Sequence, residues 1–115
     1  MSIVDNNCIF CKIIARQISS EIIAENDDVI VIKDIAPKAP IHYLIIPKKH
    51  IVDIQSMQQS DTVIGSAVFA MAQQLSQMLP APHAFRLLCS NGFDAGQRVF
   101  HLHVHFLAGK QMAEF

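Results

Sequence analysis

The stretch His101-Leu102-His103-Val104-His105-Phe106-Leu107 places three histidines at alternate positions near the end of the sequence. Side chains alternate between the two faces of a β-strand, so this pattern predicts a strand with all three imidazoles on one face. The apolar side chains between them then point into a core. Half of the six histidines of the chain lie in this stretch. Three imidazoles in register indicate a metal site or a site for phosphate chemistry rather than isolated core histidines.

The length and composition predict a single domain over residues 1–115 with a core of its own, because 51% of the residues are hydrophobic. The formal net charge of −1 gives no general attraction to nucleic acid or to an anionic membrane, so we expect neither as a partner. No apolar run reaches the roughly 20 residues of a membrane span, and the first residues lack the pattern of a signal peptide. These features predict a cytoplasmic, reducing location.

Two hydrophobic periodicities divide the chain into strands and helices. Besides the histidine strand, β-branched and apolar runs predict strands at 29–33, 41–46 and 85–90, with a shorter apolar segment at 21–25. Helical spacing predicts a long helix over 61–79, and residues 8–15 fit a short helix capped by Asn6 or Asn7. Short connections between strands favour antiparallel pairing. The predicted fold class is α+β: an antiparallel sheet of four to five strands with one long and one short helix.

The loop Asn91-Gly92-Phe93-Asp94-Ala95-Gly96-Gln97 lies directly before the histidine strand. Gly92 and Gly96 allow backbone N–H groups to approach a ligand closely, and such amides bind phosphate oxygens. Asn91 and Gln97 add neutral hydrogen-bond donors. Glycine pairs are common in hairpin loops. This pair indicates a phosphate site because three imidazoles on one face follow it.

A second group of candidate ligands combines cysteines with histidines. Two cysteines three positions apart and two distant histidines supply the donors of a closed tetrahedral zinc site: Cys8, Cys11, His50 and His101. In a reducing compartment the cysteine pair favours metal binding or redox chemistry over a structural disulfide, and the chain lacks the βαβ pattern of a thioredoxin-type site. The intervals do not match a zinc finger. Two buried thiols with unconnected histidines therefore remain an alternative.

The histidine stretch matches the signature His-φ-His-φ-His-φ-φ, where φ is apolar, and the chain resembles the histidine triad nucleotide-binding proteins. The resemblance extends over nearly the whole chain and points to the branch that hydrolyses purine nucleoside phosphoramidates. It implies a HIT-like fold. Besides the histidine stretch and the glycine loop, three segments carry it: Ile9-Phe10-Cys11-Lys12-Ile13-Ile14, Asp34-Ile35-Ala36-Pro37-Lys38-Ala39-Pro40 and His42-Tyr43-Leu44-Ile45-Ile46-Pro47-Lys48-Lys49-His50.

The resemblance implies that His103 is the nucleophile, which attacks the α-phosphorus and forms a nucleotidyl-histidine that water then hydrolyses. Imidazole suits this role because it is largely deprotonated at neutral pH and remains a good nucleophile. Donors from His105, Asn91 and the amides of the glycine loop would stabilise the phosphoryl oxygens. Either His42 or His105 would protonate the departing nitrogen, and the sequence leaves that choice open.

The resemblance further implies contacts to the nucleoside. Asp34, at a strand end, would accept hydrogen bonds from the ribose hydroxyls, and Ile35 with other apolar side chains would hold the base. From the residues alone, Asp34 also fits a turn before a proline-rich segment, and His42 a half-buried strand histidine. Arg98 stands where related phosphoramidases usually carry a small hydroxyl residue that touches phosphate. Arginine would replace that contact with a charged fork or point into solvent.

The resemblance also bears on zinc and on assembly. Some relatives hold zinc at the positions of Cys8, Cys11, His50 and His101, whereas others keep the fold without it, so zinc is not needed for the chemistry. Relatives are homodimers with sheets joined across a two-fold axis. The ending Ala113-Glu114-Phe115 lacks the aromatic and proline tail that in many relatives reaches toward the partner subunit's site, so we expect a different substrate preference.

Three functions follow from these patterns. The first is a purine nucleoside phosphoramidase that releases a nucleoside 5′-monophosphate. The second is a dinucleoside polyphosphate hydrolase, which would share the mechanism and differ in the leaving group. The third is a nucleotide-binding regulatory protein whose hydrolysis is incidental. The intact histidine stretch favours an enzyme.

Overall fold

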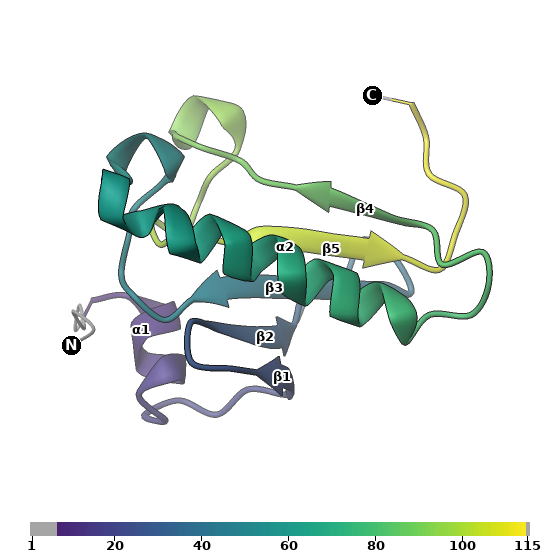
Figure 1. Cartoon of the computed structure of the whole chain (residues 1–115), viewed down its shortest axis with the longest axis horizontal. Helices are drawn as coiled ribbons and strands as arrows, with labels where there is room; N and C mark the ends of the chain where they lie inside the picture. Colours follow the sequence, from purple (N-terminus) through teal and green to yellow (C-terminus); the bar gives the residue numbers. More distant parts are fainter. Residues whose placement is uncertain (1–6, 115) are drawn as a thin grey trace.

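A computed structural model of the chain describes residues 7–114. Its centre is a five-stranded antiparallel sheet in the order β1-β2-β3-β5-β4 (Figure 1). The strands are β1 (Ile22–Glu25), β2 (Val29–Lys33), β3 (Ile41–Pro47), β4 (Phe85–Leu88) and β5 (Val104–Ala108). This sheet confirms the predicted α+β class, and the apolar segment at 21–25 supplies the fifth strand.

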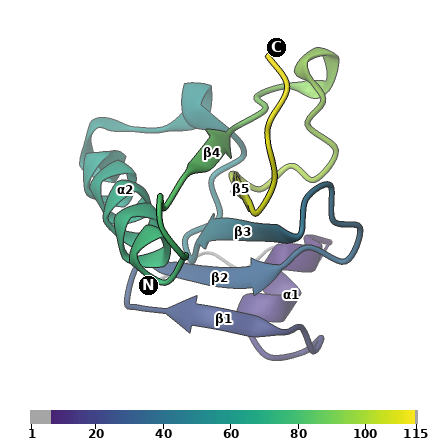
Figure 2. The ribbon, with the colours of Figure 1, turned by 90° about the vertical axis from the view of Figure 1, so that its right-hand side faces the viewer.

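Two α-helices cover opposite faces of the sheet (Figures 1 and 2). They are α1 (Ile9–Ile14) and α2 (Thr62–Gln77), and three short 3-10 helices complete the set, η1 (Ile54–Ser56), η2 (Gln59–Asp61) and η3 (Phe93–Ala95). Side chains along β2 and β3 point alternately to the two faces of the sheet. Val31 and Ile45 pack with α2 on one face, and Ile30 and Ile46 pack with α1 on the other. The sheet is therefore buried on both sides at its centre.

The long helix α2 lies within the predicted range and buries one stripe of side chains against the sheet. Met71 and Leu75 are almost fully buried in this core, as expected of apolar residues at helical spacing. Val63 and Met78 are exposed, so they lie outside the buried stripe. Asp61 precedes the helix without capping it, because its carboxylate accepts hydrogen bonds from Lys49 Nζ and the backbone N–H of residue 58 instead.

The short helix α1 begins later than predicted. Cys8 is its N-cap, and the Cys8 sulfur accepts a hydrogen bond from the backbone N–H of Cys11 at 3.4 Å. The prediction of an asparagine cap is therefore wrong for Asn7, and Asn6 lies outside the described residues. A thiol is an unusual cap, and here it coincides with the group of candidate metal ligands.

The histidine strand is shorter than its pattern predicts. The β5 ladder begins at Val104, which pairs with Ile45, so His101 and His103 lie ahead of it. The chain leaves the sheet there because the N–H of Leu102 donates to the carbonyl oxygen of Ile51, which belongs to no strand. The alternation of side chains nevertheless continues through this segment, as the packing of Leu102 away from the histidines shows.

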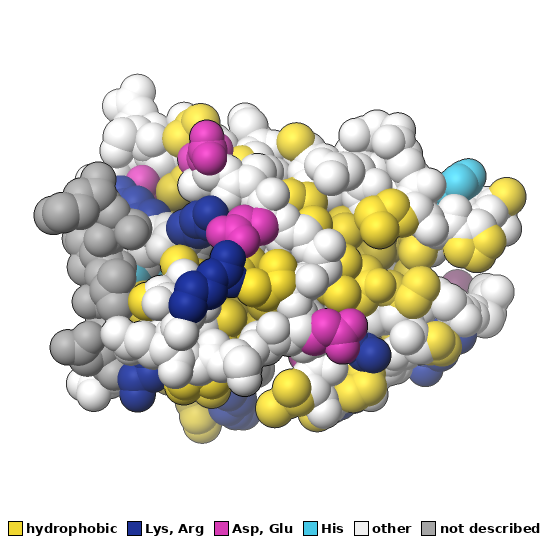
Figure 3. Space-filling model, turned by 90° about the horizontal axis from the view of Figure 1, so that it is seen from below, with side chains coloured by type: hydrophobic (Ala, Val, Ile, Leu, Met, Phe, Trp, Pro, Cys, Tyr) yellow, Lys and Arg dark blue, Asp and Glu magenta, His cyan; other side chains and the backbone are white. Residues whose placement is uncertain are grey.

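The described surface carries no extended region of one charge on the face seen in Figure 3. Lysine and arginine side chains there lie next to aspartate and glutamate, with apolar side chains between them. This fits the formal net charge of −1. Among the described residues, no helix combines the length and apolar character needed to cross a bilayer.

Candidate functional site

The three histidines of the signature share the face of the sheet that α1 covers. Phe10 of α1 contacts two of them edge-on, with ring centroids 5.8 Å from His101 and 5.0 Å from His103. The ring of His103 lies 5.3 Å from that of His105. Phe106 points to the opposite face, into the core under α2. The common face that alternation predicts is therefore present, although part of it precedes the regular strand.

One hydrogen bond determines the protonation of His103. Its Nδ1 lies 2.7 Å from the carbonyl oxygen of His101. A carbonyl oxygen can only accept, so Nδ1 carries the proton and Nε2 has a free lone pair. The described residues contain no buried side-chain nitrogen without a partner, and Nε2 has none, so this nitrogen is accessible to solvent. Burial lowers the pKa of His103, which keeps the ring neutral.

A second chain of hydrogen bonds determines the protonation of His105. The backbone N–H of Lys38 donates to Nδ1 of His42 at 2.9 Å, so the proton of a neutral His42 ring is on Nε2. That nitrogen lies 2.8 Å from Nδ1 of His105 and donates to it. His105 therefore carries its own proton on Nε2, facing away from His42. Burial, with His103 and His42 nearby, lowers the pKa of His105 to about 4.

His42 is placed behind His105 rather than in front of it. Only 4% of its surface is exposed, and both ring nitrogens have protein partners. Burial also lowers the pKa of His42. Of the two histidines that sequence leaves as proton donors to the substrate, His105 alone presents an N–H that the described residues do not use. His42 contacts the signature histidines through its hydrogen bond to His105.

Asp34 lies at the end of β2, beside the hydrogen-bonded pair His42 and His105. One carboxylate oxygen accepts from the backbone N–H of Ala36 at 2.7 Å, which confirms the turn role. The other lies 3.3 Å from Nε2 of His42. Ile35 is 98% exposed next to it, so an apolar side chain stands open at the edge of the site.

Asp34, His42 and His105 lie close enough together to be considered as metal ligands. The donor chemistry does not fit a metal there. The N–H of Lys38 occupies Nδ1 of His42, so a neutral ring has its proton on the nitrogen that would have to bind the ion. These three side chains form a hydrogen-bonded network instead.

The glycine loop is shaped by Gly92 and Gly96, whose φ angles of 86° and 104° favour glycine. Gln97 holds the loop from inside. Its amide nitrogen donates to the carbonyl oxygens of Val52 and Val99, and its amide oxygen accepts from the N–H of Gly92 at 2.8 Å. Gln97 is 2% exposed, so the structure places its side chain in the loop's framework and not at a ligand surface.

Asn91 and Arg98, at the two ends of the loop, are also engaged by protein groups. The Asn91 side-chain oxygen accepts from the N–H of Ile54 at 2.7 Å, which ties the loop to η1. Arg98 folds back over the loop, with its guanidinium carbon 4.0 Å from the centre of the Phe93 ring. Its Nη1 donates to the carbonyl oxygens of Phe93 and Gln97. Arg98 is exposed to solvent, and these contacts hold its guanidinium against the loop.

The predicted metal ligands meet at one point between α1, the end of β3 and the start of the histidine segment. Nδ1 of His101 lies 3.3 Å from the sulfur of Cys8, 3.6 Å from that of Cys11 and 3.1 Å from Nδ1 of His50. The Cys11 sulfur lies 3.2 Å from Nδ1 of His50. A tetrahedral zinc ion holds nitrogen and sulfur ligands about 3.3–3.8 Å apart. The four donors therefore match zinc in kind, and their separations of 3.1 to 3.6 Å lie within or just below that range.

The surroundings of His101 prepare it to bind a cation. Its Nε2 donates to the carbonyl oxygen of Pro47 at 2.7 Å, so Nδ1 has its lone pair toward the other three ligand atoms. His101 is completely buried and Cys11 is 1% exposed. Burial lowers the pKa of His101 to about 4, which keeps the ring neutral. A buried carbonyl acceptor behind a histidine ligand is the arrangement typical of structural metal sites.

Sequence reasoning missed several groups that build this site. Phe10 gives no signal in a single sequence, yet it contacts two of the signature histidines. The carbonyl oxygens of Pro47 and His101 and the N–H of Lys38 assign the protons of three imidazoles. Backbone groups of this kind are present at every position, so no residue pattern singles them out.

A family model and the sequences of known proteins match most of this chain. The family described as "Scavenger mRNA decapping enzyme C-term binding" matches residues 7–115. A HIT-like protein of Chlamydia muridarum is 41% identical over 101 residues, which cover 88% of this chain and 80% of that protein. A HIT-like protein of Chlamydia trachomatis is 39% identical over 101 residues, covering 88% of this chain and 91% of that protein.

Solved structures agree in fold and length. A HIT family hydrolase from Clostridium thermocellum has a TM-score of 0.91 and 43% identity, covering 96% of this chain and 97% of that chain. A histidine triad protein from Clostridium difficile has a TM-score of 0.93 and 33% identity, covering 98% of this chain and 99% of that chain. With these relatives, the complete signature and the shared five-stranded fold, the chain belongs to the histidine triad (HIT) family.

Proposed function

We propose that this HIT protein is a nucleotidyl hydrolase that cleaves purine nucleoside phosphoramidates through a nucleotidyl-His103 intermediate. The observation that carries the proposal is the hydrogen bond from Nδ1 of His103 to the His101 carbonyl oxygen at 2.7 Å, which leaves an accessible lone pair on Nε2. A hydrolase from Clostridium thermocellum with 43% identity supports hydrolysis as the reaction class.

The reaction has two displacements at phosphorus. In the first, Nε2 of His103 forms a bond to the α-phosphorus as the bond to the leaving amine breaks, and the amine takes up a proton from solvent water. The ring gains positive charge, which the His101 carbonyl stabilises through the Nδ1–H bond. In the second, water attacks the phosphorus and releases a proton to solvent as the bond to Nε2 breaks. A nucleoside 5′-monophosphate and a neutral His103 result.

His105 has the role of a hydrogen-bond donor to the reacting group. Its Nε2 proton follows from the chain of hydrogen bonds through His42 and the Lys38 N–H. Because its pKa is about 4, the free enzyme presents a neutral donor and not an imidazolium. A donor placed in advance stabilises the charge that develops on phosphoryl oxygens without rearrangement.

The nucleoside is proposed to bind at the end of β2. The second carboxylate oxygen of Asp34 would accept from the ribose hydroxyls, and the exposed Ile35 side chain would contact the base. The backbone N–H groups of Gly92, Ala95, Gly96 and Gln97 all donate to acceptors within the loop, so they build its shape and are not offered to the phosphate. Arg98, held on the Phe93 ring, places positive charge beside this loop. That charge favours the second candidate, a dinucleoside polyphosphate hydrolase with an anionic leaving group.

We further propose that Cys8, Cys11, His50 and His101 hold a structural zinc ion. The four donors and their spacing support this assignment. Bound zinc would supply a cross-link between α1 and the two segments that carry the histidine ligands. It takes no part in the displacements. The cysteines among the described residues are free thiols, and a cytoplasmic location remains the prediction from cysteine usage.

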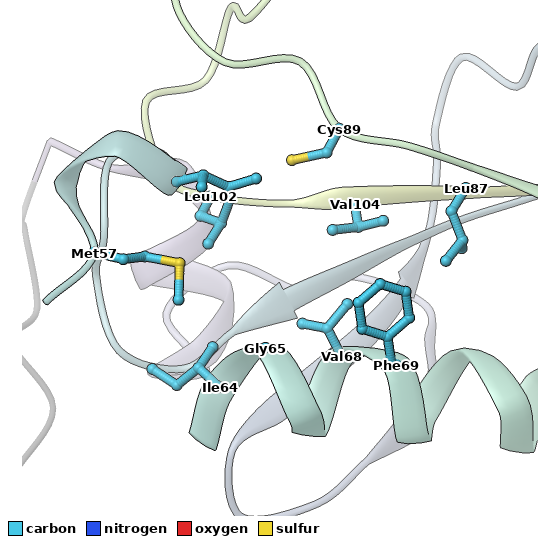
Figure 4. Close-up of a pocket in the computed structure, with 10 residues that line it drawn as sticks. Met57, Ile64, Gly65, Val68, Phe69, Leu87, Cys89, Leu102 and Val104 are labelled. Atoms are coloured by element: carbon cyan, nitrogen blue, oxygen red, sulfur yellow. The ribbon is translucent and has the colours of Figure 1, made fainter. Parts of the chain in front are cut away.

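A homodimer is proposed from the resemblance and from one apolar groove. β4 is an edge strand, and the groove lies between it, β5 and α2 (Figure 4). Figure 4 shows Leu87 and Val104 on one side and Val68 and Phe69 on the other. Phe69 is 69% exposed, so a large apolar side chain stands open at the groove. A second copy of the chain would cover this surface across a two-fold axis.

The nucleophile is tested by His103→Ala. We expect turnover of adenosine phosphoramidate to fall at least about 1,000-fold, because the covalent route is lost, while AMP still binds. Steady-state kinetics with adenosine phosphoramidate and diadenosine tetraphosphate, and calorimetry with AMP, measure both effects. His83→Ala, at an exposed position away from the site, is the control. Normal turnover in His103→Ala contradicts the assignment of the nucleophile. If wild type prefers diadenosine tetraphosphate, the second candidate function is supported. If wild type binds AMP and turns over neither substrate, the protein is a regulatory protein.

The zinc site is tested by metal analysis of wild type and Cys8→Ser. Wild type should hold about one equivalent per chain, and the variant less. If ligand loss costs at least about 1 kcal/mol, the melting temperature falls by about 4–8 °C. Cys89→Ser changes the free thiol outside the cluster and should keep both values. Metal-free wild type of full stability would remove the site from the proposal.

The homodimer is tested by sedimentation equilibrium of wild type and Phe69→Glu. Wild type should sediment as two chains of 12.8 kDa each. A buried, unpaired carboxylate at the groove should shift the variant to a monomer. Val63→Glu, also exposed on α2 but outside the groove, should remain a dimer. A monomeric wild type at all concentrations contradicts the proposal.

The pH dependence of stability tests the neutral state of His105. Its folded pKa of about 4 is below the ordinary 6.5, so between these values the unfolded state binds more protons. The free energy of unfolding should therefore fall as the pH is lowered from 6.5 to 4. Urea titrations should show a shallower fall for His105→Asn than for wild type, and an unchanged fall for the surface control His83→Asn. Equal slopes in all three proteins would show that His105 titrates normally.

A further inference from the structure

His101 contacts both the proposed metal ligands and the proposed nucleophile His103. Its ring nitrogen Nδ1 faces the sulfurs of Cys8 and Cys11, and its Nε2 donates to the Pro47 carbonyl oxygen. Its own carbonyl oxygen accepts the Nδ1 proton of His103 at 2.7 Å. Contacts that restrain the His101 ring therefore also restrain the His101 carbonyl oxygen. That oxygen accepts the Nδ1 proton of His103 and so selects its tautomer.

Phe10 makes a second connection between the two centres. It lies between the two cysteines in sequence, and its ring meets those of His101 and His103 at nearly right angles, 80° and 77°. The Phe10 ring packs edge-to-face against the His103 ring and limits the space in which that ring can rotate; we call this contact the Phe10 wall. The helix that carries it has six residues, too few to be stable alone, so its position depends on its packing and on its cysteines.

A backbone hydrogen bond makes the third connection. The N–H of Leu102 donates to the carbonyl oxygen of Ile51 at 2.6 Å. Leu102 lies between the ligand His101 and the nucleophile His103, and Ile51 follows the ligand His50. The two segments that supply histidine ligands are thus joined directly beside the nucleophile.

We propose that the metal centre is the positioning device of the nucleophile: metal held by Cys8, Cys11, His50 and His101 sets the orientation and tautomer of His103 through the His101 carbonyl and the Phe10 wall. This inference rests on the proposed function of His103. The nucleoside contacts at Asp34 and Ile35 lie at the end of β2, outside these three connections. Metal occupancy should therefore change kcat far more than nucleotide affinity.

The first test compares wild type loaded with zinc and the same protein after chelation, at one pH. Nitrogen-15 NMR of the His103 ring should show one Nδ1–H tautomer with zinc and a mixture without it. Without zinc, kcat should fall about ten-fold or more and the Kd for AMP should change less than about threefold. Adding zinc back should restore both. An unchanged tautomer and unchanged kcat in folded, metal-free protein would overturn the proposal.

The second test keeps the metal and removes the wall. Phe10→Leu should retain the zinc content of wild type, lower kcat about ten-fold and broaden or split the His103 ring signals. Val63→Ala, at an exposed position of α2 outside the groove, is the control and should leave kcat and the ring signals unchanged. Wild-type kcat and sharp His103 signals in zinc-loaded Phe10→Leu would overturn the role of Phe10, and this variant decides the matter if chelation unfolds the protein.

The two tests also separate this inference from the proposed function. If zinc-loaded wild type turns over neither adenosine phosphoramidate nor diadenosine tetraphosphate, the proposed activity fails. The NMR comparison with and without zinc then still decides whether the metal centre orients His103. If wild type is active and the His103 tautomer does not respond to zinc, the activity stands and the positioning role is excluded.

Discussion

The hydrogen bond from His103 Nδ1 to the carbonyl oxygen of His101 is the contact on which the site depends. Imidazole has two nearly equivalent tautomers in water, and only one of them exposes a lone pair on Nε2. A backbone acceptor two residues earlier selects that tautomer and limits the rotation of the ring. Because the acceptor is the carbonyl oxygen of a neighbouring residue, the contacts that hold His101 in place also hold the acceptor of His103. The signature therefore contains its own orienting group.

The neutral state of the histidines follows from the same design. His42, His101, His103 and His105 each have a protein partner for one or both ring nitrogens, and burial lowers the pKa of every one. A cluster of imidazoles this close would repel itself if charged. Burial thus keeps lone pairs on the nitrogens that are proposed to attack a phosphorus atom or bind a metal.

Regular periodicity explains what the sequence predicts well. The strands at 29–33 and 41–46 and the long helix are defined by side-chain patterns that the buried sheet enforces, and the structure confirms them. The Cys and His ligands are predicted as a set because metal chemistry restricts residue type. The start of β5, the side-chain direction of Gln97 and the folding of Arg98 onto Phe93 depend on tertiary contacts with Ile51, Val52 and η3. No local pattern contains those contacts.

The shortness of α1 suggests what the proposed metal site would add to the packing of this helix. Six residues form fewer than two helical turns, and such a helix gains little from its own hydrogen bonds. Phe10, Cys11 and Ile13 pack it on the sheet, yet apolar packing is non-directional and tolerates small shifts. Ligand bonds to a metal are directional and short, so Cys8 and Cys11 would fix α1 to within the tolerance that a ring contact at 5.0 Å needs. In the proposed metal site, precision beside His103 would then come from coordination rather than from helix stability.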